Sequence, residues 1–208
     1  MGNRYARILA AGGAAVLVAA LGVPAALAAG PWTVQPGGGV RAMSGWFTAT
    51  DTTTGTLLRC TSSAASGTFK SGSGLPGADA GSLSAVGVTG CVGPLTFHLQ
   101  AGGLPWRVSL SSYNAAKGVV RGTIGHLHLT LSGNGCTAVI DGTRATADDG
   151  RVVFRYADGT GRLKVLATGG NLHYHDVSND CLGVINSGDP VTLSVTYTVS
   201  PKQAITGP

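Results

Sequence analysis

The sequence contains no glutamate, and only 11% of its 208 residues are charged. All nine acidic residues are aspartates, and most of them stand in turn-like contexts such as Asp158-Gly159. Glutamate, lysine and arginine favour helices, so their scarcity argues against a helical protein. Serine, threonine and valine are abundant instead, and they suit pleated, half-buried strands. The composition therefore predicts an all-β protein.

The chain also lacks the patterns of several common functional classes. Its net charge is +5, of which Arg4 and Arg7 contribute two, so the remainder carries about +3. That charge is small and scattered, whereas nucleic-acid binding requires a basic stripe interleaved with aromatic residues. The sequence has no Walker-type or dinucleotide-binding glycine motif and no Gly-x-Ser-x-Gly elbow. These absences predict no nucleic-acid partner and no cofactor.

Without glutamate, the paired carboxylates of a glycosidase would have to be aspartates. The candidates, all near predicted turns, are Asp141, Asp176, Asp180 and Asp189. An aspartate in a turn more often bonds its own backbone than it takes part in catalysis. We therefore expect a protein that is not an enzyme.

The first 28 residues have the pattern of a secretory signal peptide. Arg4 and Arg7 precede an apolar run over residues 8–21, and residues 26–28 are a small-residue cleavage pattern. We expect cleavage after Ala28, with cleavage after Ala29 as the alternative. An uncleaved membrane anchor is disfavoured, because the apolar run is short and meets a helix-breaking proline. No later apolar run is long enough to cross a membrane, so we expect a protein secreted to the extracellular space.

Four cysteines in an exported chain predict two disulfides. We expect Cys60 to pair with Cys91 and Cys136 to pair with Cys181, because each pair then lies within one of two similar halves. The two other pairings are the alternatives. A cysteine-based metal site is disfavoured, because no two cysteines have the CxxC spacing.

Short alternating runs separated by turn signals fill the rest of the chain and predict about 10–12 strands. Asp149-Gly150 and Asp158-Gly159 are hairpin signals on either side of residues 151–156. The pattern predicts an antiparallel β-sandwich or barrel, preceded by the helical signal peptide.

Residues 29–208 are expected to form a single disulfide-stapled β domain. Its halves, residues 29–105 and 106–208, have similar cysteine contexts and are interpreted as two pseudo-repeats. The alternative is that two Gly/Thr-rich stretches look alike by composition alone.

Two histidine pairs, His126 with His128 and His173 with His175, stand at i and i+2 in predicted strands. Each pair should project from one face of its strand. If the two strands were neighbours, four imidazoles could approach one Cu²⁺ or Zn²⁺. The alternative is that each pair decorates a solvent face.

Four cations of one predicted hairpin are candidates for a basic face: Arg151, Arg155, Arg162 and Lys164. Within each strand the two residues share a parity, so they should project from the same side. Such a face could hold an anionic wall polymer or lipid headgroups. The alternative is a solvated face whose charge is balanced by three aspartates: Asp148, Asp149 and Asp158.

The three tryptophans are either core residues or platforms on which sugars stack. Trp106 follows Leu104-Pro105 and is predicted to lie in the core. Trp32, near the expected new N-terminus, is predicted to be the more exposed one.

Segments around the cysteines carry a resemblance to a known group of proteins. They are residues 52–63 (TTTGTLLRCTSS), Gly90-Cys91, residues 131–133, residues 136–143 (CTAVIDGT) and residues 164–172 (KVLATGGNL). Together they resemble small secreted proteins of unknown function from Streptomyces and related actinobacteria. The resemblance implies an exported β-rich protein and supplies no catalytic residue.

We therefore expect an exported, non-catalytic binding or structural protein of the bacterial cell surface or extracellular matrix. Low charge and threonine-rich faces would suit contact with cell-wall polysaccharide or with copies of the same chain. The alternative is a small-ligand carrier, which would hold either a metal between the histidine pairs or a lipid inside a barrel.

Overall fold

The computed structural model describes residues 31–144 and 149–208, so the predicted signal peptide lies outside the described residues. Within these ranges the structure has fifteen strands and one 3₁₀ helix, η1 (Asn179–Cys181). Every strand pairing in them is antiparallel. The prediction of an all-β, antiparallel fold is confirmed. The strands outnumber the expected 10–12 because several are only three or four residues long.

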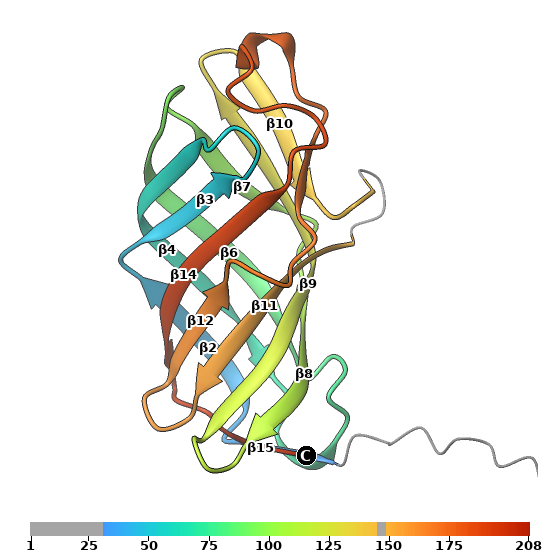
Figure 1. Ribbon diagram of the computed structural model, residues 1–208. Coiled ribbons are helices and arrows are strands. Elements are labelled where there is room, and N and C mark those ends of the chain that lie inside the picture. Colours follow the sequence, from blue (N-terminus) through green and yellow to red (C-terminus); the bar gives the residue numbers. More distant parts are fainter. Residues whose placement is uncertain (1–30, 145–148) are drawn as a thin grey trace, which may run out of the picture.

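Eight strands form a closed barrel (Figure 1). They are β2 (Gly38–Ser44), β4 (Leu57–Phe69), β6 (Gly81–Val92), β8 (Trp106–Asn114), β9 (Val119–Gly133), β11 (Gly150–Ala157), β12 (Arg162–Leu166) and β14 (Val191–Ser200). Each strand pairs with the next in this order, and the ring closes where β14 pairs with β2. Of the two predicted architectures, sandwich and barrel, the structure adopts the barrel. Both halves of the chain contribute strands to its wall.

The two-residue period of the strands separates the barrel interior from its outer wall. In β14 the valines, Leu193 and Tyr197 are buried and alternate with more accessible threonines and serines. In β11 the inward positions are Val152, Phe154 and Tyr156. Burying one apolar face per strand is what holds a small barrel together, because that face fills the interior.

The barrel wall is tightly packed at Gly122 of β9. Gly122 stands between Leu110 of β8 and Phe154 of β11 in the ladder. The Phe154 ring lies against the place that a side chain at position 122 would occupy. Glycine is required here by this close approach.

Replacing Gly122 with alanine is expected to lower the free energy of unfolding by about 2 kcal/mol. The new Cβ would meet the Ser109 carbonyl oxygen and the Phe154 ring, and the carbonyl belongs to the neighbouring strand. Gly125→Ala is the matched control, because nothing lies within 4 Å of its Cβ position in the same strand. Urea unfolding of both variants measures the difference, and equal midpoints would contradict the packing argument.

A second sheet extends the barrel at its upper end in Figure 1. The first part of β9 pairs with β8 and β11, and its last part pairs with β7 (His98–Gly102) and β10 (Cys136–Asp141). The strand changes partners at His126, which has a φ of +61°, beside a register shift between Gly150 and Arg151. β13 (His173–His175) pairs with β10, and β3 (Phe47–Asp51) lies between β14 and β4.

A three-stranded sheet lies at the lower end, near the C-terminus in Figure 1. In it β1 (Trp32–Gln35) pairs with both β15 (Ala204–Thr206) and β5 (Gly72–Leu75). The buried Gln203 side chain accepts a hydrogen bond from the Gly37 N–H (2.9 Å). The Tyr156 hydroxyl donates to the Gln203 carbonyl (2.9 Å) and accepts from its N–H (2.8 Å). These bonds fasten the terminal strands across the lower end of the barrel.

Both disulfides form with the predicted pairing. Cys60–Cys91 joins directly opposite residues of β4 and β6 in the barrel wall. Cys136–Cys181 joins the start of β10 to η1 in the upper part. The two bonds therefore occupy different structural positions, although their sequence contexts are similar.

Candidate functional site

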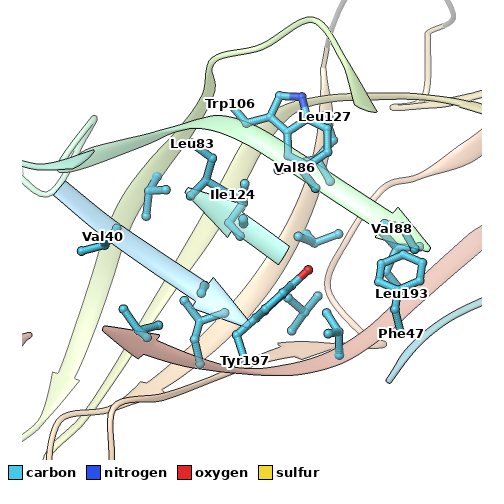
Figure 2. Close-up of a pocket in the computed structure, with 18 of the residues that line it drawn as sticks. Val40, Phe47, Leu83, Val86, Val88, Trp106, Ile124, Leu127, Leu193 and Tyr197 are labelled. Atoms are coloured by element: carbon cyan, nitrogen blue, oxygen red, sulfur yellow. The ribbon is translucent and has the colours of Figure 1, made fainter. Parts of the chain in front are cut away.

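The barrel encloses a cavity of about 70 Å³ (Figure 2). Its twenty lining side chains come from all eight barrel strands and from β3. Nineteen of them are aliphatic or are Phe or Trp, and the twentieth is Tyr197. Protein interiors rarely leave voids larger than one water molecule, which needs only about 10–15 Å³. A void of this size with an apolar lining is suited to an apolar guest rather than to water.

The cavity exists because the lining residues are small for the space between eight strands. Half of them are valine or alanine, among them Val40, Ala42 and Ala65. An eight-stranded barrel is just wide enough for side chains to fill it, or to hold one small ligand when they do not. Short side chains on β2, β4 and β6 therefore leave room that longer ones would occupy.

One polar pair interrupts the apolar lining. The Tyr197 and Ser63 hydroxyl oxygens are 2.7 Å apart, and both residues are buried. Ser63 donates its single hydrogen to the Gly87 carbonyl (3.2 Å), so Tyr197 is the donor to Ser63. Burial raises the pKa of Tyr197, which keeps the phenol neutral. Figure 2 shows the Tyr197 hydroxyl pointing among the apolar side chains, where its oxygen can still accept a hydrogen bond.

Strand β6 has an unpaired edge in the side of the barrel. It pairs with β4 along most of its length, but with β8 only through residues 81–83. Beyond Leu83, no strand in the described ranges pairs with that edge of β6. Val86 and Val88 line the cavity there and are partly exposed, whereas the cavity-lining side chains of β9 and β14 are buried. β7 lies beside this edge without pairing to it. The edge is the candidate entrance to the cavity, since the lower end of the barrel is fastened by the Gln203 hydrogen bonds.

The structure does not bring the four candidate metal-binding histidines together. The metal hypothesis required their two strands to be neighbours, and that premise is wrong. β9 and β13 are not neighbours, because β10 lies between them. His128 bonds Asp141, while the ring nitrogens of His173 and His175 lie 2.9 Å and 2.7 Å from backbone carbonyl oxygens. His126 lines a separate surface hollow with Arg107. No group of three metal-ligating side chains occurs in the part of the chain that the structure describes.

Asp141 is a buried carboxylate whose partners the sequence did not reveal. One oxygen accepts the N–H groups of Gly142 (2.7 Å) and Gly150 (3.0 Å). The other lies 2.9 Å from the His128 Nδ1 atom. The expectation that such aspartates bond nearby backbone is confirmed for Asp141, and for Asp189, which accepts the Asn186 N–H (3.1 Å). Asp141 therefore has a clear structural role, which is to fix the end of β10 to the start of β11.

Three of the four predicted basic-face residues lie together on the outer wall. Arg155 and Lys164 are directly opposite each other, and Arg162 lines the same hollow. Arg151 does not line it, because it lies beyond the paired end of β12, opposite Gly125. The sequence analysis missed Arg121, which the long-range β9–β11 pairing places opposite Arg155.

The tryptophans differ from expectation at one of the two predicted positions. Trp106 is buried in the barrel, as predicted. Trp32 is completely buried rather than exposed, because β15 and β5 flank its strand. Trp46 is the exposed one, and the Arg59 guanidinium lies 5.8 Å from its ring centroid.

No helix in residues 31–144 and 149–208 is long and apolar enough to cross a membrane. Comparisons of the chain with family models, with curated proteins and with solved structures found no match in any of the three. Function is therefore inferred from the geometry of the barrel cavity and of the basic hollow alone.

Proposed function

We propose that the protein is an extracellular carrier of a small, largely apolar molecule that has one hydrogen-bond donor. The observation that carries the proposal is the apolar cavity, beside which the edge of β6 is unpaired and partly exposed. Removing apolar surface from water contributes about 25 cal/mol per Å², so a guest that fills the void gains affinity from burial. Two disulfides are in keeping with an oxidising, extracellular environment.

The polar pair in the cavity favours a guest with a donor. The Tyr197 oxygen has acceptor capacity left after its proton is used on Ser63. A hydroxyl group of the guest would find its partner there, while the rest of the guest contacts valine and leucine side chains. The volume of about 70 Å³ is about half that of an engineered apolar cavity that takes up benzene. The site therefore suits a guest of a few carbon atoms, or the end of a longer chain that passes the unpaired edge of β6.

The test uses primary alcohols of three to eight carbons and their methyl ether isomers, which have the same atoms but no donor. Binding is measured by amide chemical-shift titration of the folded protein. We expect saturable binding, with each alcohol bound about two- to tenfold more tightly than its ether. In the double variant Ser63→Ala/Tyr197→Phe this preference should disappear while ether binding remains.

Val86→Trp places a large side chain in the cavity wall at the unpaired edge of β6 and should weaken binding of every probe at least tenfold. Ala85→Trp is the matched control, because Ala85 is an exposed neighbour on the same strand that does not line the cavity. Absence of saturable binding by all probes, or equal binding by these two variants, would overturn the carrier proposal.

A further inference from the structure

Three cations stand directly opposite one another on the outer wall of the barrel. Arg121 of β9 pairs with Arg155 of β11, and Arg155 pairs with Lys164 of β12. All three are exposed. Neighbouring strands lie about 4.8 Å apart, so the three side chains arise within about 10 Å of one another. Like charges opposite each other destabilise a sheet, so this row costs stability unless an anion lies over it.

The row lies in a groove of about 790 Å³. Lys117 and Arg162 add two more cations to the lining, and Ser112, Asn114 and Thr196 add hydrogen-bonding groups. Among the described residues that line the groove, none is acidic. The groove therefore concentrates positive charge in a concave surface, which strengthens its attraction for anions.

The aspartates that were expected to balance these cations are engaged elsewhere. Asp149 lies against Thr143 (3.2 Å) and Arg144 (3.8 Å). Burial raises the pKa of the Asp158 carboxyl, which lines a different hollow together with Lys202. Asp148 lies outside the described residues. No ion pair found in the described ranges involves a cation of the groove.

We infer that this groove binds a linear polymer that carries phosphate groups at short intervals. Arginine presents a planar fork of donors that matches phosphate oxygens, and charge-assisted bonds of this kind are about twice as strong as neutral ones. A row of cations along one groove contacts several phosphates of one chain at once. A single small anion would meet only part of the row.

Two other polyanions fit the groove less well. A membrane surface would favour exposed apolar side chains beside the cations, but the large exposed ones, such as Met43 and Trp46, do not line the groove. Single-stranded nucleic acid is bound through successive aromatic platforms. In the described lining Tyr113 is the one aromatic residue.

The groove goes beyond the carrier proposal, because it does not depend on the cavity. In the barrel order, β11 and β12 lie opposite β4 and β6. A polymer bound over β11 and β12 would hold the protein at a phosphate-rich surface while the unpaired edge of β6 faces away from it. The two sites can therefore be tested separately.

The experiment measures binding of inorganic polyphosphate of defined length by isothermal titration calorimetry, with orthophosphate as the monomeric comparison. The groove variant is Arg121→Gln/Arg155→Gln/Lys164→Gln. The control variant, Arg41→Gln/Lys70→Gln/Arg151→Gln, removes the same charge from exposed positions outside the groove. We expect polyphosphate to bind the wild type and the control within twofold of each other, and the groove variant at least tenfold more weakly. The groove variant should also unfold at a higher temperature than the wild type, because its like-charge row is gone.

Several results would overturn the inference. Equal loss of affinity in both variants would show that net charge alone attracts polyphosphate. If orthophosphate bound as tightly, per phosphate group, as polyphosphate does, a site for a polymer would be excluded. Tighter binding to phosphatidylglycerol-containing vesicles or to single-stranded DNA than to polyphosphate would assign the groove to a different partner. None of these results bears on alcohol binding in the cavity, so failure here leaves the carrier proposal standing.

Discussion

Replacing Cys136 and Cys181 together with alanine is expected to lower the free energy of unfolding by about 4 kcal/mol. The bond closes a loop of 45 residues. In the chain-entropy model, removing this constraint increases the conformational entropy of the unfolded chain, which stabilises the unfolded state by about 4 kcal/mol. Both residues are buried, so the lost sulfur contacts add to the effect. Alanine is preferred to serine because it leaves no hydroxyl without a partner in the core. The measurement is urea unfolding of the oxidised wild type and the variant.

The position of this bond predicts where the effect should appear first. η1 and the loop after it have little regular structure, and the disulfide ties them to β10. The segment is also held by hydrogen bonds outside the strand ladders, such as the Ser178 N–H donating to the Thr137 carbonyl (2.9 Å) and the Thr56 hydroxyl donating to the Val184 carbonyl (2.6 Å). We expect hydrogen exchange to accelerate most in this segment, while the barrel strands retain protection at low denaturant.

Cys60→Ala/Cys91→Ala provides the comparison. Its loop of 31 residues predicts a loss of similar size, but the bond joins strands that are already paired over many residues. Its removal should therefore lower global stability without selective exchange in the η1 segment. An unchanged unfolding midpoint in either double variant would contradict the entropic argument for that bond.

Local patterns in the sequence were sufficient to predict many of the strands and the directions of most of their side chains. The alternation in β14 and the turn between β11 and β12 involve residues close in the chain, and both are confirmed. The same reasoning correctly placed Arg155 and Lys164 on one face. Each of these inferences needs only the two-residue period of a strand and a short hairpin.

Most of the features that the sequence did not reveal depend on residues far apart in the chain. Barrel closure requires β14 to pair with β2, and parity within one strand says nothing about its partner. Trp32 is buried because the last strand of the chain returns to pair with the first. Arg121 joins the basic row only through the β9–β11 ladder. The cavity is likewise a property of the closed ring, because its lining is collected from nine strands.

The histidine hypothesis failed for a local reason as well as a long-range one. Strand parity assumes a regular backbone, but His126 has a positive φ where β9 changes partners. Such a conformation is uncommon for a residue other than glycine, and no pattern in the neighbouring sequence indicated it. The side chains of His126 and His128 therefore meet different neighbours.

Asp141→Ala is expected to lower the free energy of unfolding by about 3 kcal/mol. The substitution leaves the buried N–H groups of Gly142 and Gly150 without their acceptor, and each unsatisfied buried group costs about 1–3 kcal/mol. It also removes one partner of the His128 ring. The loss should appear as a lower midpoint of urea unfolding at neutral pH.

Asp141→Asn separates the hydrogen bonds from the charge. Its amide oxygen can still accept both N–H groups, and its amide nitrogen can donate to the His128 Nδ1 atom if the ring carries its proton on Nε2. We therefore expect this variant to lose only about 1 kcal/mol, because bonds to a neutral acceptor are weaker than bonds to a carboxylate. Asp79→Asn is the surface control, since its ion pair with Arg107 is exposed and should contribute less than about 1 kcal/mol. Asparagine also tolerates the positive φ of position 79 (+50°), which alanine does not. If stability decreases in the order wild type, Asp141→Asn, Asp141→Ala, then Asp141 is the acceptor that holds β10 to β11. An alanine variant as stable as the surface control would show instead that the N–H groups of Gly142 and Gly150 find other partners.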